Sequence, residues 1–294
     1  MVLEEFDENK RAAINPDDIV KPVKGMPKTA VTCFAKETFL RMLDTFGGEK
    51  IAETMVANME IPVYRTVYKG VELALFMSDV GAPACVAALE DIYCMGAERI
   101  VMFGTCGVLD AKIADCSIII PDAAVRDEGT SFHYAPLSDE IAVNTKYIGD
   151  FKEMLDGIGC SYTVGKTWTT DGVYRETRGK VERRKEAGCI CVDMECSAVA
   201  ALAWFREKDV FQFFYAADNL DAEVWDERSL GNTVNLSAKD KVAMLAMDFA
   251  VRIGGRENTK EKKDFPLGKA YAIIRVVDHV GTKVECDEED DYES

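Results

Sequence analysis

The central feature of this sequence is the segment Cys189-Ile190-Cys191-Val192-Asp193-Met194-Glu195-Cys196-Ser197-Ala198. Its apolar half ends in two acids around a methionine, and small apolar residues continue to Trp204. The pattern predicts a buried strand that runs directly into a helix, with Glu195 at the carboxyl end of the strand. Ligands of open α/β sheets bind outside the carboxyl ends of the strands, so Glu195 is a candidate for holding hydroxyl groups. Equally, acids such as Asp193 and Glu195 are typical of residues that cap the following helix.

An alternation of strands and helices extends from this segment in both directions. Lys69-Gly70 joins two of the strands as a hairpin, and the later alternation indicates parallel neighbours. We therefore expect one α/β domain over residues 28–255, with a central mixed, largely parallel sheet flanked by helices. The pattern predicts strands at 29–34, 61–68, 71–78, 99–103, 116–126, 161–168, 189–194 and 210–216, and helices at 36–57, 83–95, 139–157, 175–187, 196–207 and 237–253.

The two ends of the chain differ from this domain. Residues 1–27 contain three prolines and scattered charge without a period, which predicts an N-terminal arm that lies over the body or over a neighbour. Residues 256–294 form a C-terminal extension. Within it, residues 269–277 have strand composition and suit an added edge strand or an oligomer contact, and an acidic tail follows. We expect the tail to be a solvated end.

Charge and cysteine usage exclude several classes of protein. The net charge is −17, and the seven acids of residues 284–294 account for only part of it, leaving −10 for residues 1–283. An acidic body argues against nucleic acid and anionic membranes as partners. Ten cysteines lie mostly in apolar runs without a CxxC pair, and only His133 and His279 accompany them, so no metal site is expected. The start of the chain shows no leader pattern, and we expect a cytoplasmic protein.

Further segments at strand ends carry side chains suited to binding or catalysis. Gly104-Thr105-Cys106-Gly107 brings backbone donors and a hydroxyl close to a ligand, although glycine-rich turns are common. Residues 126–134 and 169–174 are also compatible with ordinary polar turns. Asp218 leaves a very apolar strand, and burial raises the pKa of such a carboxyl, so that it can act as a general acid. The candidates in these two turns are Arg126, Asp171, Val173 and Tyr174.

These segments together resemble the nucleoside phosphorylase family, which includes bacterial purine nucleoside phosphorylase and uridine phosphorylase. The similarity runs from about Val31 to Gly254. It rests on the Gly-Thr-Cys-Gly turn, Arg126 to Pro136, Asp171 with Tyr174, Ala217-Asp218 and the Asp-Met-Glu run, which is similar to the family's Glu-Met-Glu ribose motif. The resemblance implies a phosphorylase-like fold, a nucleoside substrate, no metal or organic cofactor, phosphate as co-substrate, and a homo-oligomer, either a dimer or a hexamer.

The resemblance also implies roles for individual residues. Glu195 would accept hydrogen bonds from ribose hydroxyls, and Met194 would pack under the sugar. Thr105 would contact the anion or the sugar, and Asp218 would protonate the imidazole-side nitrogen of a purine. The remaining substrate-binding candidates are Gly104, Cys106 and Gly107 beside the base, together with Arg126, Asp171, Val173, Tyr174, Asp193 and Arg228, the last as a partner of Asp218.

The sequence departs from the family at the phosphate site, and this leaves three functions open. Cys33-Phe34-Ala35-Lys36-Glu37 replaces a Gly-Asp-Pro-type loop, and Met102 stands where an arginine is expected. The first reading is a phosphorylase, with a purine nucleoside favoured by Asp218 over a pyrimidine. The second is a nucleosidase in which Glu37 activates water, although an acid in the first turn of a helix is also an ordinary surface residue. The third is a nucleoside-binding protein without turnover.

Overall fold

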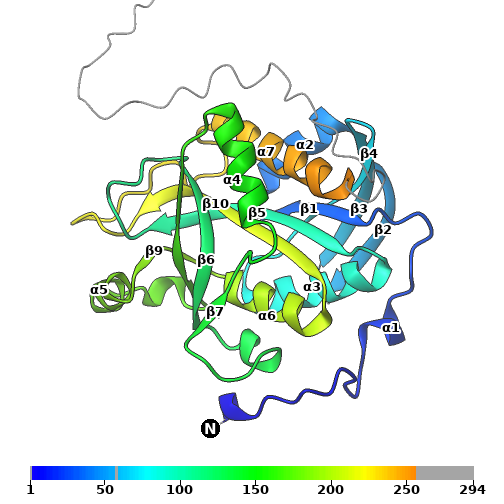
Figure 1. The fold of residues 1–294 in the computed structure, drawn as a ribbon, viewed down its shortest axis with the longest axis horizontal. Helices are drawn as coiled ribbons and strands as arrows, with labels where there is room; N and C mark the ends of the chain where they lie inside the picture. Colours follow the sequence, from blue (N-terminus) through cyan, green and yellow to red (C-terminus); the bar gives the residue numbers. More distant parts are fainter. Residues whose placement is uncertain (1, 57–58, 256–294) are drawn as a thin grey trace, which may run out of the picture.

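The computed structural model describes residues 2–56 and 59–255, which form a mixed sheet with helices on both faces (Figure 1). The strands are β1 (Thr29–Cys33), β2 (Glu49–Val56), β3 (Met59–Tyr68), β4 (Val71–Met77), β5 (Arg99–Val108), β6 (Ile118–Asp127), β7 (Glu140–Ala142), β8 (Tyr162–Thr170), β9 (Cys189–Asp193) and β10 (Asp209–Asn219). The helices are α1 (Pro16–Ile19), α2 (Lys36–Phe46), α3 (Ala82–Met95), α4 (Ile148–Ile158), α5 (Arg178–Glu186), α6 (Cys196–Arg206) and α7 (Leu236–Gly254), with short 3-10 turns η1 (Val2–Glu4), η2 (Thr130–His133) and η3 (Val173–Arg175).

The sheet has two parts that meet at β5. On one side, β1 pairs with β5 in parallel, and β4 pairs with β1 in parallel. The antiparallel strands β3 and β2 complete this part of the sheet. On the other side, β10 pairs with both β5 and β6, so that β5, β9, β8, β6 and β10 close into a ring. The predicted α/β architecture with a mixed sheet is confirmed.

Two apolar layers attach the helices to the sheet. α2, α4 and α7 cover one face, where Phe103, Phe211 and Phe213 of the central strands pack against Phe151 and Phe249. α3 and α6 cover the other face, as Figure 1 shows. Because both faces of the central strands are buried, their sequences read as continuous apolar runs.

The prediction of helices over residues 36–57 is wrong for the second half of this range. α2 ends at Phe46, and Gly47 adopts a positive φ of 68° while its N–H bonds to the Leu43 carbonyl. A left-handed residue terminates a helix, and glycine adopts this conformation without steric cost. The chain then forms β2, which pairs with β3 in antiparallel register. The helix predicted near 139–157 is likewise shorter, because β7 occupies Glu140–Ala142.

Two strands at the centre are longer than expected. β5 continues through Gly104 and Gly107, so this segment is part of a strand and not a turn after one. β10 continues to Asn219 and contains a bulge between Ala216 and Asp218, opposite Cys106 and Gly107. A bulge changes the direction of a side chain, and this one sets the orientation of Asp218.

The N-terminal residues pack on the body of the molecule. Phe6 contacts the rings of Trp204 and Phe205 at the end of α6, with centroids 6.2 Å away in both cases. Arg206 donates to the Lys10 carbonyl at 2.8 Å. The first part of the arm predicted for residues 1–27 therefore lies over α6. Its later part packs on α3, where the Val23 N–H donates to the Met95 carbonyl at 2.9 Å. The predicted edge strand and acidic tail of residues 256–294 lie outside the described residues.

Candidate active site

Two acids flank the glycine-containing end of β5. Gly107 pairs with Val192 of β9 on one side and with Asp218 of β10 on the other. Glu195 follows β9 directly and begins α6. The ring of strands thus brings Glu195 and Asp218, which are distant in the sequence, to the two sides of one strand.

Asp193 organises the turn that carries Glu195. One carboxylate oxygen accepts hydrogen bonds from Thr167 and Thr169, each at 2.9 Å. The other accepts the backbone N–H groups of Glu195 and Cys196 at 2.8 and 2.6 Å. Burial raises the pKa of Asp193, and these four bonds oppose the rise. Both oxygens are thus engaged by the protein, so the structure gives Asp193 a supporting place, whereas the sequence assigned it to the substrate.

Replacing Asp193 with alanine should lower the free energy of unfolding by about 3 kcal/mol, because four buried donors lose their acceptor. Urea denaturation of wild type and variant measures the change. Asp171→Ala is the matched control, since the exposed Asp171 accepts a single bond, from the Gly129 N–H at 3.0 Å. Equal destabilisation by the two substitutions would contradict the supporting role of Asp193.

Glu195 is held differently from Asp193. It makes no capping bond to α6, and one of its carboxylate oxygens accepts the Gly81 N–H at 2.6 Å from the loop after β4. The side chain is buried, and burial together with the charge of Asp193 raises the pKa of Glu195 to about 8. Hydroxyl donors on a ligand would strongly stabilise such a buried carboxyl, because their hydrogen bonds replace those to the water that burial removed. Met194 beside it is half-buried.

Asp218 lies at the opposite side of Gly107. One of its oxygens accepts the Trp225 indole N–H at 2.9 Å, and the other lies 3.1 Å from the position that a Cβ on Gly107 would occupy. Leu220 lies even closer to that position, at 2.4 Å, so a side chain at residue 107 would displace the end of Leu220. Burial raises the pKa of Asp218, and the Trp225 bond opposes the rise. The sequence contains no signal for Trp225, which lies in a loop.

A second carboxyl stands close to Asp218. Burial raises the pKa of Glu176 to about 7, and the charge of Asp218 adds to this rise. Arg178 ties this segment to the loop after β10 by donating to the carbonyls of Leu220 at 2.6 Å and Glu223 at 3.0 Å. The surroundings of Asp218 therefore include a second carboxyl.

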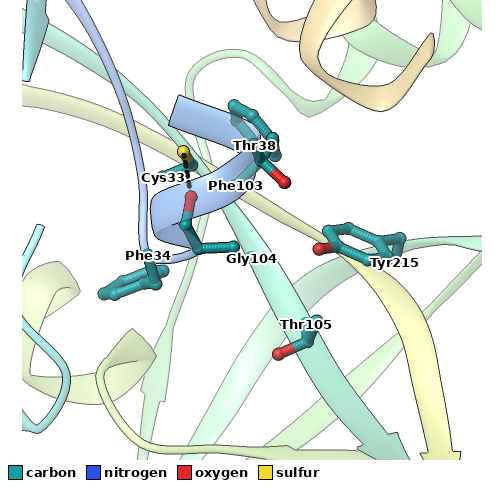
Figure 2. A pocket seen from close by; sticks show the side chains of 8 residues that line it. Cys33, Phe34, Thr38, Phe103, Gly104, Thr105 and Tyr215 are labelled. Atoms are coloured by element: carbon teal, nitrogen blue, oxygen red, sulfur yellow. Dashed lines mark hydrogen bonds between the residues drawn. The ribbon is translucent and has the colours of Figure 1, made fainter. Parts of the chain in front are cut away.

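A small pocket opens at the end of β1 and the middle of β5, beside the start of α2 (Figure 2). It holds about 210 Å³ including its mouth, which is less than a whole nucleoside site requires. Thr38 is 1% exposed, and its hydroxyl has no hydrogen-bond partner among the described residues. The residues that line it are Cys33, Phe34, Ala35, Thr38, Phe103, Gly104, Thr105 and Tyr215, none of them charged.

The positive end of α2 faces this pocket. Ala35 occupies the N-cap position and offers no capping side chain, and the first helical bond runs from Phe39 N–H to the Ala35 carbonyl. Unpaired N–H groups at a helix start favour anions. The hydroxyls of Thr38, Thr105 and Tyr215 belong to the same lining. This combination suits an oxyanion bound by neutral donors.

The arginines of α2 and β3 pair with acids and do not line this pocket. Met102 is fully buried in the layer under α3 and α6. Arg41 pairs with Asp240 of α7, and Arg65 pairs with Glu49 at 2.6 Å. The ring of Phe34 covers Gly104, and a Cβ there would lie 2.7 Å from it. Apolar groups thus replace the expected cations around this pocket.

Glu37 does not line the pocket, although its neighbour Thr38 does. It is half-buried in the first turn of α2, close enough to Arg41 for its charge to raise the pKa of that guanidinium. The structure therefore places this candidate base on α2 beside Arg41, outside the pocket that a water nucleophile would share with Thr38.

Arg126 shapes the loop after β6. It donates to the Ser131 hydroxyl at 2.8 Å and to the Pro136 carbonyl at 2.6 Å, and it stacks on Phe132 with its guanidinium carbon 4.1 Å from the ring centroid. Burial lowers the pKa of Arg126. The hydrogen bonds of Arg126 stabilise the fold of this loop. The hydrogen bond that the Gly129 N–H donates to Asp171 holds the start of the loop.

The other predicted contacts lie nearer the surface. Val173 is 47% exposed and Tyr174 is 95% exposed, both on η3. Arg228 donates to Asp226 at 3.4 Å and to the Ile113 carbonyl at 2.9 Å, and its charge lowers the pKa of Asp218. The hydrogen bond to Asp218 expected from Arg228 is made by Trp225.

The described part of the chain contains no cluster of histidine, cysteine and acidic residues able to hold a metal ion. Separately, none of the described helices combines the length and apolar character needed to cross a bilayer.

Comparisons with known proteins identify the family of this chain. The family model of the Phosphorylase superfamily matches residues 28–249. The chain is 25% identical over 158 residues to a guanosine phosphorylase of Halorubrum lacusprofundi, covering 52% of this chain and 63% of the relative. It is 31% identical over 123 residues to a uridine phosphorylase of Thermococcus kodakarensis, covering 42% and 44%. These two matches therefore span less than two thirds of each relative.

A longer alignment and a solved structure extend the comparison. A purine nucleoside phosphorylase of DeoD type from an Exiguobacterium species is 22% identical over 236 residues, covering 74% of this chain and 94% of the relative. The crystal structure of a uridine phosphorylase from Vibrio fischeri superposes with a TM-score of 0.67 at 20% identity, covering 82% of this chain and 99% of that one. The latter similarity establishes the fold.

Proposed function

Since this chain belongs to the phosphorylase superfamily, as its sequence resemblance predicted, we propose that it cleaves the N-glycosidic bond of a purine nucleoside with phosphate. The products are the free base and ribose 1-phosphate. The observation that carries the proposal is the placement of the two acids on the strands that flank β5: Asp218 lies in β10 opposite Gly107, and Glu195 follows β9. This pair matches the two ends of a nucleoside, the sugar and the base.

The reaction moves one proton and one bonding pair at the base. The bond between C1′ and N9 breaks with its electrons going to the purine, and positive charge develops on the ribose ring. Asp218 gives its proton to N7, which neutralises the departing base. Glu195 accepts hydrogen bonds from ribose hydroxyls and fixes the sugar. A phosphate oxygen then bonds to C1′, and Asp218 regains a proton from solvent.

Asp218 also supports the choice of purine over pyrimidine. Only a purine carries an imidazole nitrogen that a carboxyl at this side can protonate. A raised pKa keeps Asp218 protonated at a higher pH than an exposed aspartate, as a general acid requires.

The pocket at the start of α2 supports phosphate as the acceptor. Its helix N–H groups and three hydroxyls are donors, and one of these hydroxyls, that of Thr38, is buried without a partner among the described residues. A phosphate oxygen would satisfy this group and so offset the cost of burying it.

Hydrolysis is the second candidate function, because no cation lines the same pocket. Charge-assisted bonds contribute about 1.5–3 kcal/mol each, and a water molecule does not need them. The test is to incubate the protein with inosine, adenosine, guanosine and uridine, with and without phosphate. Ribose 1-phosphate formed only with phosphate supports the proposal. Free ribose formed in both conditions supports hydrolysis, and binding without product indicates a nucleoside-binding protein.

Replacing Thr38 with valine should raise the KM for phosphate about tenfold and leave the KM for the nucleoside unchanged, because only the acceptor pocket loses a donor. Initial rates at varied phosphate measure this effect. Thr66→Val is the matched control: it removes another buried hydroxyl, which donates to the Phe46 carbonyl at 2.7 Å away from the pocket. If both variants change the two KM values alike, Thr38 has no specific place in acceptor binding.

We also propose that the protein forms a homo-oligomer, a dimer or a hexamer, as the family resemblance implies. Light scattering of the purified full chain during size-exclusion chromatography measures its mass directly. A mass near 32.6 kDa would show a monomer and refute this proposal.

A further inference from the structure

Trp225 combines an exposed position with a bond to a buried acid. Its side chain is 52% exposed in the loop between β10 and α7. Its indole N–H nevertheless donates to Asp218 at 2.9 Å. The loop is held at Asp226, the residue after Trp225, because the Asn219 N–H donates to the Asp226 carbonyl at 2.8 Å. The loop thus places the indole ring of Trp225 against Asp218 on the solvent side.

This bond distinguishes the two oxygens of Asp218. An indole N–H is only a donor, so the oxygen that faces Trp225, Oδ2, acts as the acceptor. In the neutral carboxyl the proton then resides on Oδ1. This oxygen lies 3.1 Å from the Cβ position of Gly107, on the side of β5 that the base would face.

We infer that Trp225 is a positioning residue for Asp218: its N–H fixes the carboxyl orientation and directs the transferable proton toward the Gly107 side. The inference rests on the proposed cleavage reaction. A rotated carboxyl would turn its proton toward the loop, where no base is held, so turnover depends on this bond more than substrate binding does.

Other groups also influence the titration of Asp218. Glu176 approaches from the segment before α5, Asp226 and Arg228 belong to the same loop as Trp225, and Cys106 lies on β5. Burial raises the pKa of Asp218, whereas the indole N–H and the charge of Arg228 lower it. Removing the indole N–H therefore raises the pKa further. The acid then stays protonated to a higher pH.

The test is Trp225→Phe, which keeps an aromatic ring and removes the N–H. We expect kcat for the purine nucleoside to fall about tenfold, with KM changed less than twofold and the alkaline limb of the rate profile moved to higher pH. Trp204→Phe is the matched control, because Trp204 is 58% exposed at the end of α6, where it contacts Phe6. A Trp225→Phe profile that superposes on wild type, or a lower kcat with an unmoved alkaline limb, overturns the inference.

A second measurement separates this inference from the proposed function. In the Trp204→Phe background, tryptophan emission should titrate with Asp218, because protonation of the bonded carboxyl changes the indole environment. The double variant Trp204→Phe/Asp218→Asn should lose this titration. If the wild type cleaves no nucleoside, the proposed reaction fails, while the fluorescence titration still decides whether Trp225 senses Asp218. An identical titration in both proteins overturns the inference.

Discussion

Replacing Asp218 with asparagine should lower kcat for purine nucleosides by about 10²–10⁴-fold and change KM less than threefold. Asparagine has nearly the same shape, and its carbonyl oxygen can still accept the Trp225 N–H. It cannot give a proton to N7, so the departing base keeps its negative charge in the transition state. Steady-state rates with inosine, adenosine and guanosine measure the loss.

The substrate 7-methylguanosine provides the control for this prediction. Its N7 already carries a methyl group and the base leaves without protonation, so the variant should cleave it almost as fast as wild type. A similar loss on 7-methylguanosine and guanosine would show that Asp218 acts through binding or folding. Equal changes in kcat and KM with inosine would refute its role as the acid.

Replacing Glu195 with glutamine should have two opposite effects. It should lower kcat/KM about 10²-fold, because the amide NH₂ replaces one of the two oxygens that can accept hydrogen bonds from the ribose hydroxyls. It should also raise the thermal stability of the free protein in alkaline solution. Burial raises the pKa of the folded Glu195 carboxyl to about 8, against 4.5 for the ordinary glutamate. Wild type therefore loses stability as the pH rises between these values, because the unfolded chain releases the proton first.

The glutamine variant does not titrate and escapes this loss. The difference in Tm between variant and wild type should be small near pH 4.5 and reach several degrees near pH 9. Scanning calorimetry at both pH values measures it, and Glu176→Gln offers a comparison, since the pKa of Glu176 is raised only to about 7. A Tm difference that does not depend on pH would contradict the buried, neutral state of Glu195.

Sequence reasoning located the two principal acids because each follows an apolar strand. Glu195 and Asp218 were chosen from this context, and the structure places them just after β9 and in β10, the two strands that flank the end of β5. The sequence left helix capping and ligand binding open for both Asp193 and Glu195, since two acids at one helix start look alike. Only the structure shows that one faces Thr167 and Thr169 while the other reaches Gly81.

Other parts of the site depend on contacts between distant segments. Thr38 looks like any threonine in a helix, and its unsatisfied hydroxyl becomes visible only when β5 and β10 surround it. Trp225 lies in a loop without periodicity. The error over residues 36–57 has a local cause. Gly47-Gly48 ends the helix, although apolar residues continue on both sides of these glycines.

The ring of strands affects when the site forms during folding. Arg99 of β5 pairs with Asp209 of β10, so the ring closes only after most of the chain has been synthesised. Contacts so distant in sequence slow folding, since a long loop must be ordered before they form. Asp218 consequently reaches its place beside β5 late on the folding pathway, and a nascent chain that ends before β10 has not yet formed the candidate site.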